Sequence, residues 1–253
     1  MKKRLSLVIA SVMALSLSFY SLASATETVV IPADTGKFSN EVYLNGQPIK
    51  ENTVIYANDE NQEDLVEKYG LEKPSPSAKL VSIQIVNNDV DATQPKSLLP
   101  KDDNDYISPS SEIFGFKIVK GATQNVDGWT EVARAKYFCS KAIGLTCAGV
   151  QLSVTANESV SVQVQSSLTV GANKAVAAEF GRTVGESIGV STIVNVPIDV
   201  PGGKTGIAVG YPIYKSTFCS VYGKGIFSDT FLGGATYLEP KPSSIAVTSW
   251  IQG

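Results

Sequence analysis

"GVQLSVTANESVSVQVQSSLTVGANK", Gly149–Lys174, has an unusually long regular pattern of apolar and polar residues. An apolar side chain returns at every second residue over its length, whereas an ordinary strand has only about five or six residues. The alternation continues to Val200: from Val150 onward, 20 of the 26 even positions carry Val, Leu, Ile, Phe or Ala, against 3 of the 25 odd positions. A period of two is the pattern of a strand with one buried face, so this half of the chain is predicted to be an amphipathic β ribbon.

The course of the ribbon follows from its phase. One long strand is predicted from Leu152 to Val170, with a bulge where Glu158 interrupts the apolar face. If Val170 faces Val176 across "GANKA", both sides of the turn keep the same face, and Gly and Asn there tolerate a left-handed backbone. Residues 174–189 stay ambiguous. Their apolar side chains also recur every four residues, as in a helix, but three glycines disfavour a helix, so a strand is preferred.

Shorter elements are predicted in the first half of the chain. Asn45-Gly46 between apolar alternations indicates a hairpin turn, "NQEDLVEKYG" (61–70) indicates a short helix, and Lys79–Val86 alternates as a strand. The composition changes to Val, Ser, Thr and Gly beyond residue 140. We therefore expect a β-rich α+β region over 26–140 and a long-stranded region over 141–253. The predicted fold class is mainly β: an elongated antiparallel sheet with long amphipathic strands and at most one or two short helices.

The N-terminus predicts export. Basic residues at positions 2–4 precede an apolar stretch that ends in Ala23-Ser24-Ala25, which has the small-x-small form of a signal-peptidase site. We expect a signal peptide over 1–25, cleaved after Ala25, and a secreted mature protein. The less favoured alternative is an N-terminal anchor helix, for which the apolar run is short.

Charge and cysteine content are consistent with export. Loss of the leader lowers the basic residues from 21 to 18 against 24 acids, a net charge of about −6, and no basic stripe remains for nucleic acid. Cys139 and Cys147 flank a seven-residue segment and are the preferred disulfide pair; a bond from Cys219 to one of them is the main alternative. Three reduced cysteines are less favoured in an oxidising compartment.

The chain has no histidine, which excludes Ser-His-Asp and Cys-His catalysis and His-ligated zinc. A pair of carboxylates is the remaining catalytic option, and the acids are scattered without visible pairing. The prediction is therefore a protein that is not an enzyme, with no catalytic residue, no cofactor and no metal site.

Three motifs admit a second interpretation. "VPGGKTG" resembles the end of a phosphate loop, but the pattern of the motif is incomplete and a turn between strands is favoured. Asp102, Asp103 and Asp105 could bind calcium, but the required glycine and distal Glu are missing, which favours a solvated loop. The aromatic residues after the Gly-Gly turn could line a carbohydrate or lipid-headgroup surface, although core and edge of one strand is favoured; they are Tyr211, Tyr214, Phe218 and Tyr222.

The order of these elements resembles a known family. A Ser/Thr/Val-rich strand, a glycine-containing middle, the second strand "GVSTIVNVPIDV", the "VPGGKTG" turn and an aromatic strand are similar to the aerolysin-type β-pore-forming proteins. They also look like a group of uncharacterised exported proteins of Gram-positive bacteria. The resemblance covers about Leu152–Tyr222.

The resemblance implies that an amphipathic segment refolds into a transmembrane hairpin when subunits assemble. Carried onto this sequence, the hairpin would be roughly 160–196, with "AVAAEF" near its tip. A spanning strand needs about nine to eleven alternating residues. Charged residues in or near the tip depart from the family pattern, and no receptor-binding module is recognisable in 26–140. The candidate membrane-facing residues are Val160, Val162, Val164, Leu168, Val170, Val176, Phe180, Val184, Ile188, Val190, Val194 and Val196.

Two functions of different classes follow. The first is a secreted, non-enzymatic β protein that acts on membranes by oligomerisation and β-hairpin insertion, with membrane lipid or a cell-surface molecule and copies of itself as partners. The second is an exported, non-lytic protein that binds a partner or the cell envelope and keeps the long strands as a rigid stalk. A carboxylate-based hydrolase is the least favoured. Nucleic acid is not expected as a partner.

Overall fold

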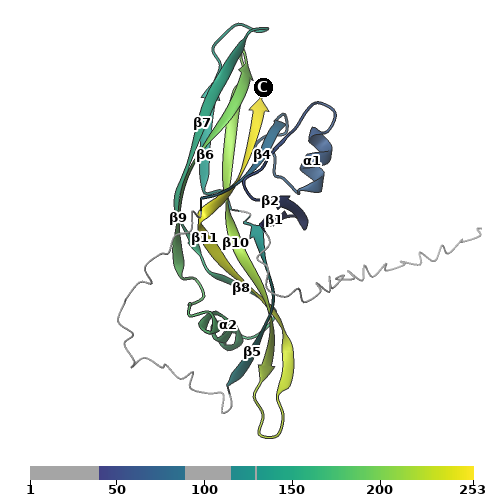
Figure 1. The fold of residues 1–253 in the computed structure, drawn as a ribbon, viewed down its shortest axis with the longest axis vertical. Helices are drawn as coiled ribbons and strands as arrows, with labels where there is room; N and C mark the ends of the chain where they lie inside the picture. Colours follow the sequence, from purple (N-terminus) through teal and green to yellow (C-terminus); the bar gives the residue numbers. More distant parts are fainter. Residues whose placement is uncertain (1–39, 89–114, 129) are drawn as a thin grey trace, which may run out of the picture. The chain divides into compact units, whose positions relative to one another are not determined.

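The computed structural model describes residues 40–88, 115–128 and 130–253, and in them the chain is mainly β with two short helices, which confirms the predicted fold class (Figure 1). The strands are β1 (Glu41–Leu44), β2 (Gln47–Lys50), β3 (Val54–Tyr56), β4 (Lys79–Asn87), β5 (Phe116–Asp127), β6 (Ala133–Phe138), β7 (Thr146–Ser161), β8 (Gln163–Gln165), β9 (Ser187–Pro201), β10 (Thr205–Gly223) and β11 (Thr230–Gln252). The helices are α1 (Gln62–Lys68) and α2 (Val170–Glu179).

The main sheet is built around one long hairpin. β10 and β11 pair antiparallel from Thr205 opposite Gln252 to Gly223 opposite Thr230, a length of about 60 Å at ~3.3 Å per residue. The sheet runs in the order β2-β1-β5-β10-β11-β4-β3, with β6 paired to β10 and β8 to β11. The β1–β5 pair is parallel and the other pairs are antiparallel. The "PGGK" turn that joins β9 to β10 confirms the favoured interpretation of that motif.

Three groups of elements cover parts of the main sheet. The separate sheet of β7 and β9 packs over one face, where Val154, Val190 and Val200 are fully buried. β1, β2 and α1 contribute to a second core, which includes the buried Trp250 of β11. α2 packs against a third cluster near the end of the β10–β11 hairpin (Figure 1).

The local predictions in the first half are confirmed. Asn45 and Gly46 have φ values of 48° and 75°, and they form the two-residue turn between β1 and β2. Helix α1 ends before Gly70, whose φ of 59° a glycine adopts without steric cost. Residues Lys79–Asn87 form a strand between β3 and β11.

The division near residue 140 stays a prediction, and the main sheet takes strands from both sides of it: β4 and β5 precede it, and β10 and β11 follow it. The predicted leader (1–25) and the Asp102–Asp105 alternative for calcium lie outside the described residues. No helix in the described ranges is both long enough and apolar enough to cross a membrane.

Candidate functional site

The two Ser/Thr/Val-rich strands lie side by side, as the sequence predicts. β7 and β9 pair antiparallel in a continuous register in which Leu152 faces Val196 and Val154 faces Val194. From Leu152 to Val160 and from Ile188 to Val200 the even-numbered side chains are buried or partly buried, apart from the exposed Glu158, and the odd-numbered side chains are exposed. The ribbon therefore has one apolar and one polar face.

The bulge predicted at Glu158 is wrong. Glu158 stays in register opposite Val190, and the register shifts instead between Cys147 and Val150. Gly149 accounts for the shift: its φ is 67°, and its backbone N–H donates to Asp199 Oδ1 at 2.7 Å. A glycine in the left-handed region is typical of one class of β-bulge.

The ribbon opens at a defined point. Ser161 faces Ser187, and one residue further the Val162 N–H donates to the Glu186 carbonyl at 2.8 Å. Beyond it the two chains separate. Residues 163–165 form β8, which pairs with residues 236–238 of β11 instead of with the chain that precedes β9.

The predicted single strand from Leu152 to Val170 is therefore wrong beyond Gln165. The turn with Val170 opposite Val176 does not form, because Thr169 begins helix α2: its Oγ1 accepts a hydrogen bond from the Ala172 N–H at 3.3 Å. The strand preferred for 174–189 is wrong for 174–179, where the chain is helical, and for 180–186, which form turns, and it is right from Ser187.

Helix α2 is held by a small apolar face. Ala172, Val176 and Ala177 are buried against the cluster that contains Cys219 and Tyr237. The spacing of four and five residues suits a helix. Tertiary burial and the Thr169 cap thus outweigh a period of two that favours a strand.

The chain after α2 is tied to β11 and β5. The ring of Phe180 stacks on Tyr237 with centroids 3.9 Å apart and planes 4° apart. The Lys120 ammonium of β5 also contacts Phe180 and lies 4.4 Å from its ring centroid. The same ammonium forms an ion pair with Glu179. The position of α2 is thereby fixed at its C-terminal end.

Arg182 makes a second attachment. Its Nε donates to Glu239 of β11 at 3.0 Å, and its Nη1 donates to Glu186 at 2.8 Å. Burial acts to lower the pKa of Arg182, but the hydrogen bonds to both carboxylates outweigh it and raise that pKa. The Thr183 backbone N–H and the Arg182 guanidinium lower the pKa of Glu186. The ion pairs of Arg182 with Glu186 and Glu239 thus hold residues 182–186 against the sheet.

The candidate membrane-facing residues have mixed environments, and their role stays a prediction. Val160, Val162, Val176, Val190, Val194 and Val196 are buried. Val164, Leu168, Phe180 and Ile188 are partly buried. Val170 and Val184 are exposed, at 72% and 45% of their surface.

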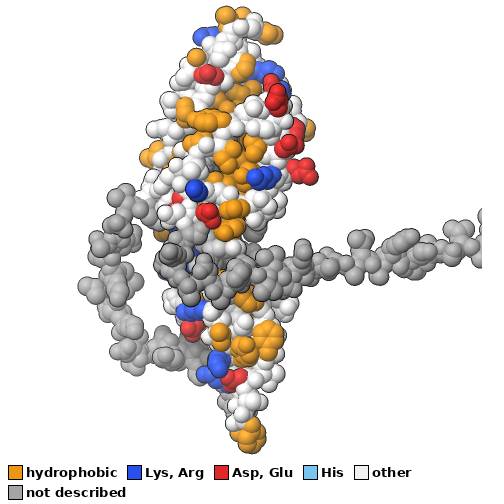
Figure 2. Space-filling view, turned by 45° about the vertical axis from the view of Figure 1, so that its right-hand side comes forward, with side chains coloured by type: hydrophobic (Ala, Val, Ile, Leu, Met, Phe, Trp, Pro, Cys, Tyr) orange, Lys and Arg blue, Asp and Glu red, His pale blue; other side chains and the backbone are white. Residues whose placement is uncertain are grey.

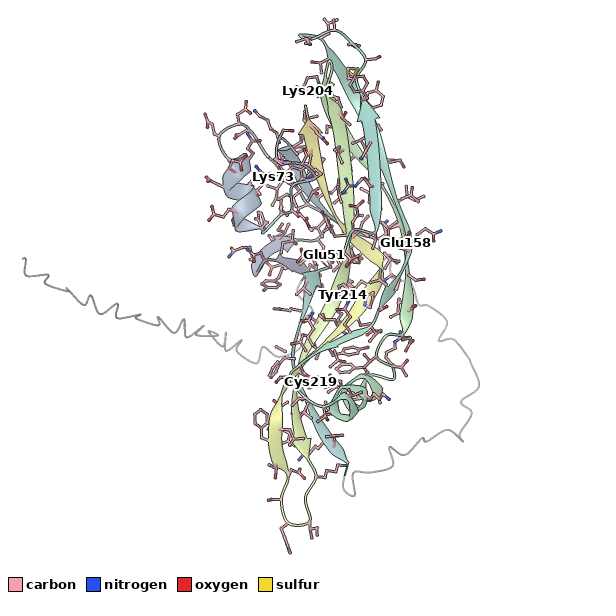
Figure 3. The ribbon with its side chains drawn as sticks, turned by 180° about the vertical axis from the view of Figure 1, so that it is seen from behind. Glu51, Lys73, Glu158, Lys204, Tyr214 and Cys219 are labelled. Carbon is pink, nitrogen blue, oxygen red and sulfur yellow. A yellow bond between two sulfur atoms is a disulfide. The ribbon has the colours of Figure 1, made fainter. Side chains whose placement is uncertain are left out.

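The four aromatic residues on β10 do not form one surface. Tyr211 is partly buried against the cluster that contains Trp250, whereas Tyr214 packs under the β7–β9 sheet and accepts a hydrogen bond from Gln163 Nε2 at 3.3 Å (Figure 3). The two side chains are three residues apart on one strand and therefore point to opposite faces of the sheet. Phe218 is exposed and Tyr222 is partly buried, in line with the favoured interpretation of core and edge.

The preferred disulfide is confirmed. Cys139 and Cys147 are bonded, with their Cα atoms 5.9 Å apart. Cys219 is free and buried, and burial raises the pKa of its thiol. A buried thiol with a raised pKa is not an activated nucleophile.

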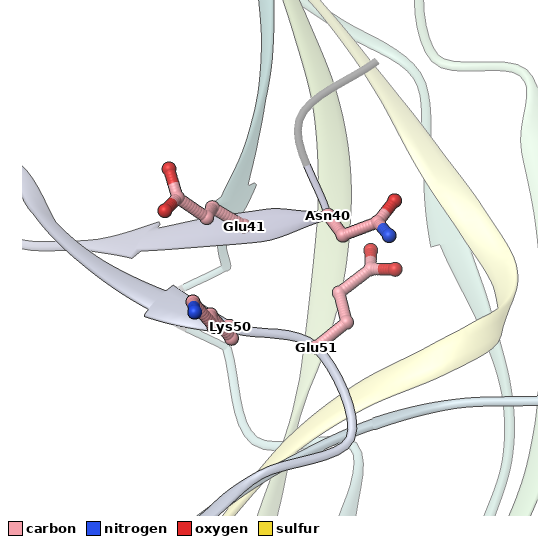
Figure 4. A pocket seen from close by; sticks show the side chains of 4 residues that line it. All are labelled: Asn40, Glu41, Lys50 and Glu51. Atoms are coloured by element: carbon pink, nitrogen blue, oxygen red, sulfur yellow. The ribbon is translucent and has the colours of Figure 1, made fainter.

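An open hollow at the ends of β1 and β2 is lined by Asn40, Glu41, Lys50 and Glu51, of which two are acids (Figure 4). The carboxylate of Glu51 points towards Asn40, while that of Glu41 points the other way (Figure 4). Glu51 also accepts hydrogen bonds from side chains of three strands; the donors are Asn87, Asn125 and Lys241. Glu51 thus joins strands, and the two carboxylates do not converge on one point. No group of metal-ligating side chains is found in the described part of the chain.

One exposed feature was not singled out from the sequence. Ile226 and Phe227 lie in the turn between β10 and β11 and are 73% and 98% exposed. Two adjacent apolar residues inside the turn "GKGIFSD" were the available signal, because turns are ordinarily polar.

Comparison with known proteins gives little beyond this. No family model matches the chain, and no curated protein sequence matches it. Among solved structures, the parasporin-2 Bacillus thuringiensis toxin, described as recognising cancer cells, is similar at 12% identity, with 55% of this chain and 67% of that chain covered and a TM-score of 0.19. That is a weak resemblance of fold, and no inference about this chain rests on it.

Proposed function

We propose that this chain is an exported, non-enzymatic β protein that acts on membranes by self-assembly and by insertion of residues 160–196 as a β-hairpin. The segment that changes conformation is 163–185, which contains β8, α2 and the Arg182 turn. Lipid and further copies of the chain are its partners in this proposal.

The register of the β7–β9 ribbon carries the proposal. Ser161 pairs with Ser187, and Lys174 lies midway between them in the sequence. If the same register continues past its present opening, the turn falls on residues 173–175. Apolar residues then meet apolar residues on one face: Val164 with Val184, Leu168 with Phe180, and Ala172 with Val176. The segment is thus in phase with a hairpin that it does not form in the described structure.

The present exposure of the segment supports the same proposal. Val170 and Val184 keep the strand phase although neither is buried. A helix and a polar turn do not require apolar side chains at these positions, whereas the extended hairpin places both on its apolar face. From Val162 to Ala172 the hairpin arm has eleven residues, enough to span a bilayer.

One feature favours the second candidate, an exported protein that binds a partner without lysis. In the extended register Ser166 would face Arg182 in the middle of the apolar face, and an Arg near the bilayer midplane costs about 2–4 kcal/mol. In the described structure the same Arg182 ties the segment to Glu239. This attachment would keep the β7–β9 ribbon rigid, as a stalk that presents a binding surface requires.

A disulfide lock tests the proposal. Gln165→Cys with Thr236→Cys would link β8 to β11, at a pair that lies in register, and would hold residues 163–165 on the main sheet. We expect the mature wild-type protein to release dye from vesicles and to form an oligomer that resists SDS. The oxidised lock should abolish release, and a reductant should restore it.

The matched control is Ser153→Cys with Asn195→Cys, a pair that is also in register but links β7 to β9 within the ribbon. This lock is compatible with the extended hairpin, so release should persist. The wild type treated with reductant controls for opening of Cys139–Cys147. Absence of release by the wild type on every lipid mixture, with or without proteolytic nicking, would favour the non-lytic candidate.

A further inference from the structure

The end of the β10–β11 hairpin carries a set of exposed apolar side chains, here called the apolar hairpin end. Ile226 and Phe227 form its tip, and Phe231 and Leu232 follow at 58% and 44% exposure. Figure 2 shows apolar side chains at the lower extremity of the molecule and on the face above it. Phe227 is 98% exposed, so its apolar surface stays in contact with water and gains almost no stabilisation from burial in this fold.

The same surface continues onto the sheet. Val119 of β5 and Phe218 of β10 are 44% and 48% exposed. An added Cβ at Gly234 of β11 would lie 2.8 Å from the Phe218 ring, whereas one at Gly121 of β5 would lie 3.2 Å from the Phe218 carbonyl oxygen. Gly234 thus leaves room for the ring, which stays on the surface. The opposite face of these strands is covered by α2.

The charge around this end differs from that of the whole chain. Of the described residues in 116–121, 168–181 and 217–235, four are lysines and two are acids; they are Lys117, Lys120, Lys174, Lys224, Glu179 and Asp229. Both acids form ion pairs with lysines, Asp229 with Lys117 and Glu179 with Lys120. Two positive charges remain in excess, whereas the chain as a whole is acidic.

We propose that the apolar hairpin end docks on an anionic lipid surface, with Ile226 and Phe227 entering the interfacial layer. Apolar and aromatic residues flanked by lysines match the apolar boundary and the anionic headgroups of a bilayer. A flat protein partner would bury only the two tip side chains, on the order of 300–400 Å², well below the ~800 Å² per partner of a stable interface.

The position of this end supports lipid as the occupant. β7 and β9 separate at Ser161 and Ser187, at the end of the ribbon nearer the β10–β11 turn, since their other ends adjoin the start of β10. The segment proposed to insert and the apolar hairpin end therefore face the same way (Figure 1). This argument for lipid from the position of the hairpin end rests on the proposed function.

Vesicle binding of paired variants tests the docking. Ile226→Ser with Phe227→Ser removes the exposed tip without touching the core. The matched control is Ile143→Ser with Leu145→Ser, which removes two exposed apolar side chains, 93% and 57% exposed, from the disulfide loop at the other end of β10. On vesicles with 30% phosphatidylglycerol we expect the tip variant to bind at least tenfold more weakly, and the control to bind within twofold of the wild type.

A directional probe complements the affinities. An environment-sensitive fluorophore on Phe227→Cys should shift to the blue when these vesicles are added, whereas the same fluorophore on Lys204→Cys, in the turn before β10 (Figure 3), should not. Unchanged binding of the tip variant, loss of binding in the Ile143 and Leu145 control, or a blue shift at position 204 alone would overturn the docking proposal. A vesicle-independent shift that grows with protein concentration would do the same, because it would identify the end as a contact between copies.

Failure of this proposal and failure of the proposed function are distinguishable. If wild-type protein binds vesicles through Phe227 but releases no dye, the docking stands and the insertion of 160–196 fails. If dye is released while the tip variant binds and acts as the wild type does, the insertion stands and the docking fails. The oxidised Gln165→Cys, Thr236→Cys protein should bind vesicles without releasing dye.

Discussion

Phe180 lies flat against Tyr237, with ring centroids 3.9 Å apart and planes inclined by only 4°. Phe180 ends helix α2 and Tyr237 lies in the middle of β11, so the stack joins the segment between β7 and β9 to the main sheet. Lys120 lies over Phe180, 4.4 Å from its centroid.

Phe180→Ala should lower the free energy of unfolding by about 2 kcal/mol, because a partly buried aromatic ring and its stacking partner are lost. Tyr237→Phe is the control. The Tyr237 hydroxyl is buried near Arg182 and makes no hydrogen bond of good geometry, so its removal should change stability by less than about 0.5 kcal/mol. Chemical denaturation measures both. Equal losses in the two variants would contradict the role given to the ring.

Arg182→Met should release residues 182–186 from β11. The ion pairs to Glu186 and Glu239 are partly exposed, so the loss of stability should be small, about 0.5–1 kcal/mol. Faster amide hydrogen exchange in α2 and β8 should accompany it. If the extended hairpin forms in a membrane, the same change removes the polar residue from its apolar face and should speed dye release severalfold.

Arg134→Met is the matched control for this variant. Arg134 pairs with Glu131 at a similar side-chain exposure, on β6, outside the segment. It should leave dye release and the exchange of α2 unchanged. If Arg134→Met accelerates release as much as Arg182→Met does, the effect reflects net charge and not the segment.

Asp127, at the end of β5, is the residue from which we expect a dependence of stability on pH. Burial raises the pKa of its carboxyl group to about 6 from 3.8. A carboxyl whose folded pKa is raised destabilises the fold above that pKa, and the destabilisation disappears as the pH falls from about 6 towards 4. Asp127→Asn should therefore raise the free energy of unfolding at pH 7.5 by on the order of 2 kcal/mol and change it little at pH 4.

The exposed Asp64 of α1 provides the control for Asp127, since Asp64→Asn removes one negative charge without changing a buried site. Denaturation curves at pH 7.5 and pH 4 compare the two variants. A gain in Asp127→Asn that persists at pH 4 would contradict the assignment of the effect to ionisation.

Cys139→Ser with Cys147→Ser should lower the free energy of unfolding by about 2.5 kcal/mol, the value that loop-closure entropy gives for a loop of this length. The fold should survive the change, because backbone hydrogen bonds also hold this loop: Gly203 N–H donates to the Cys139 carbonyl at 2.9 Å and Gly202 N–H to the Leu145 carbonyl at 2.7 Å. A thermal melt with and without reductant gives the comparison. A wild type insensitive to reductant would contradict it.

Several elements could be predicted because their cause is local. The Asn45-Gly46 turn requires a backbone conformation that these two residue types readily adopt, and helix α1 ends where Gly70 takes a left-handed conformation. The alternation in 150–160 and 190–200 could be read correctly because one face of each strand is buried along its whole length. The short separation of Cys139 and Cys147 favoured their pairing without excluding a bond from Cys219, and the structure contains the favoured pair.

Two other features could not be predicted because their cause lies in distant contacts. The helix in 170–179 forms where a strand pattern continues, since Val176 and Ala177 find a buried site against β10 and β11. The bulge at Gly149 depends on Asp199, fifty residues further along the chain.

Alternation of apolar and polar residues is enough to predict long, two-faced strands, because an extended backbone with a period of two buries one face of such a segment. It locates the ribbon around 150–160 and 190–200 but extends the first strand too far. The conformation of the 163–185 segment between the two strands is set by tertiary contacts. Its period of two and its spacing of four permit both strand and helix, and the choice is made by burial of Val176, by the Phe180–Tyr237 stack and by the Arg182 ion pairs, all contacts with strands far away in the sequence.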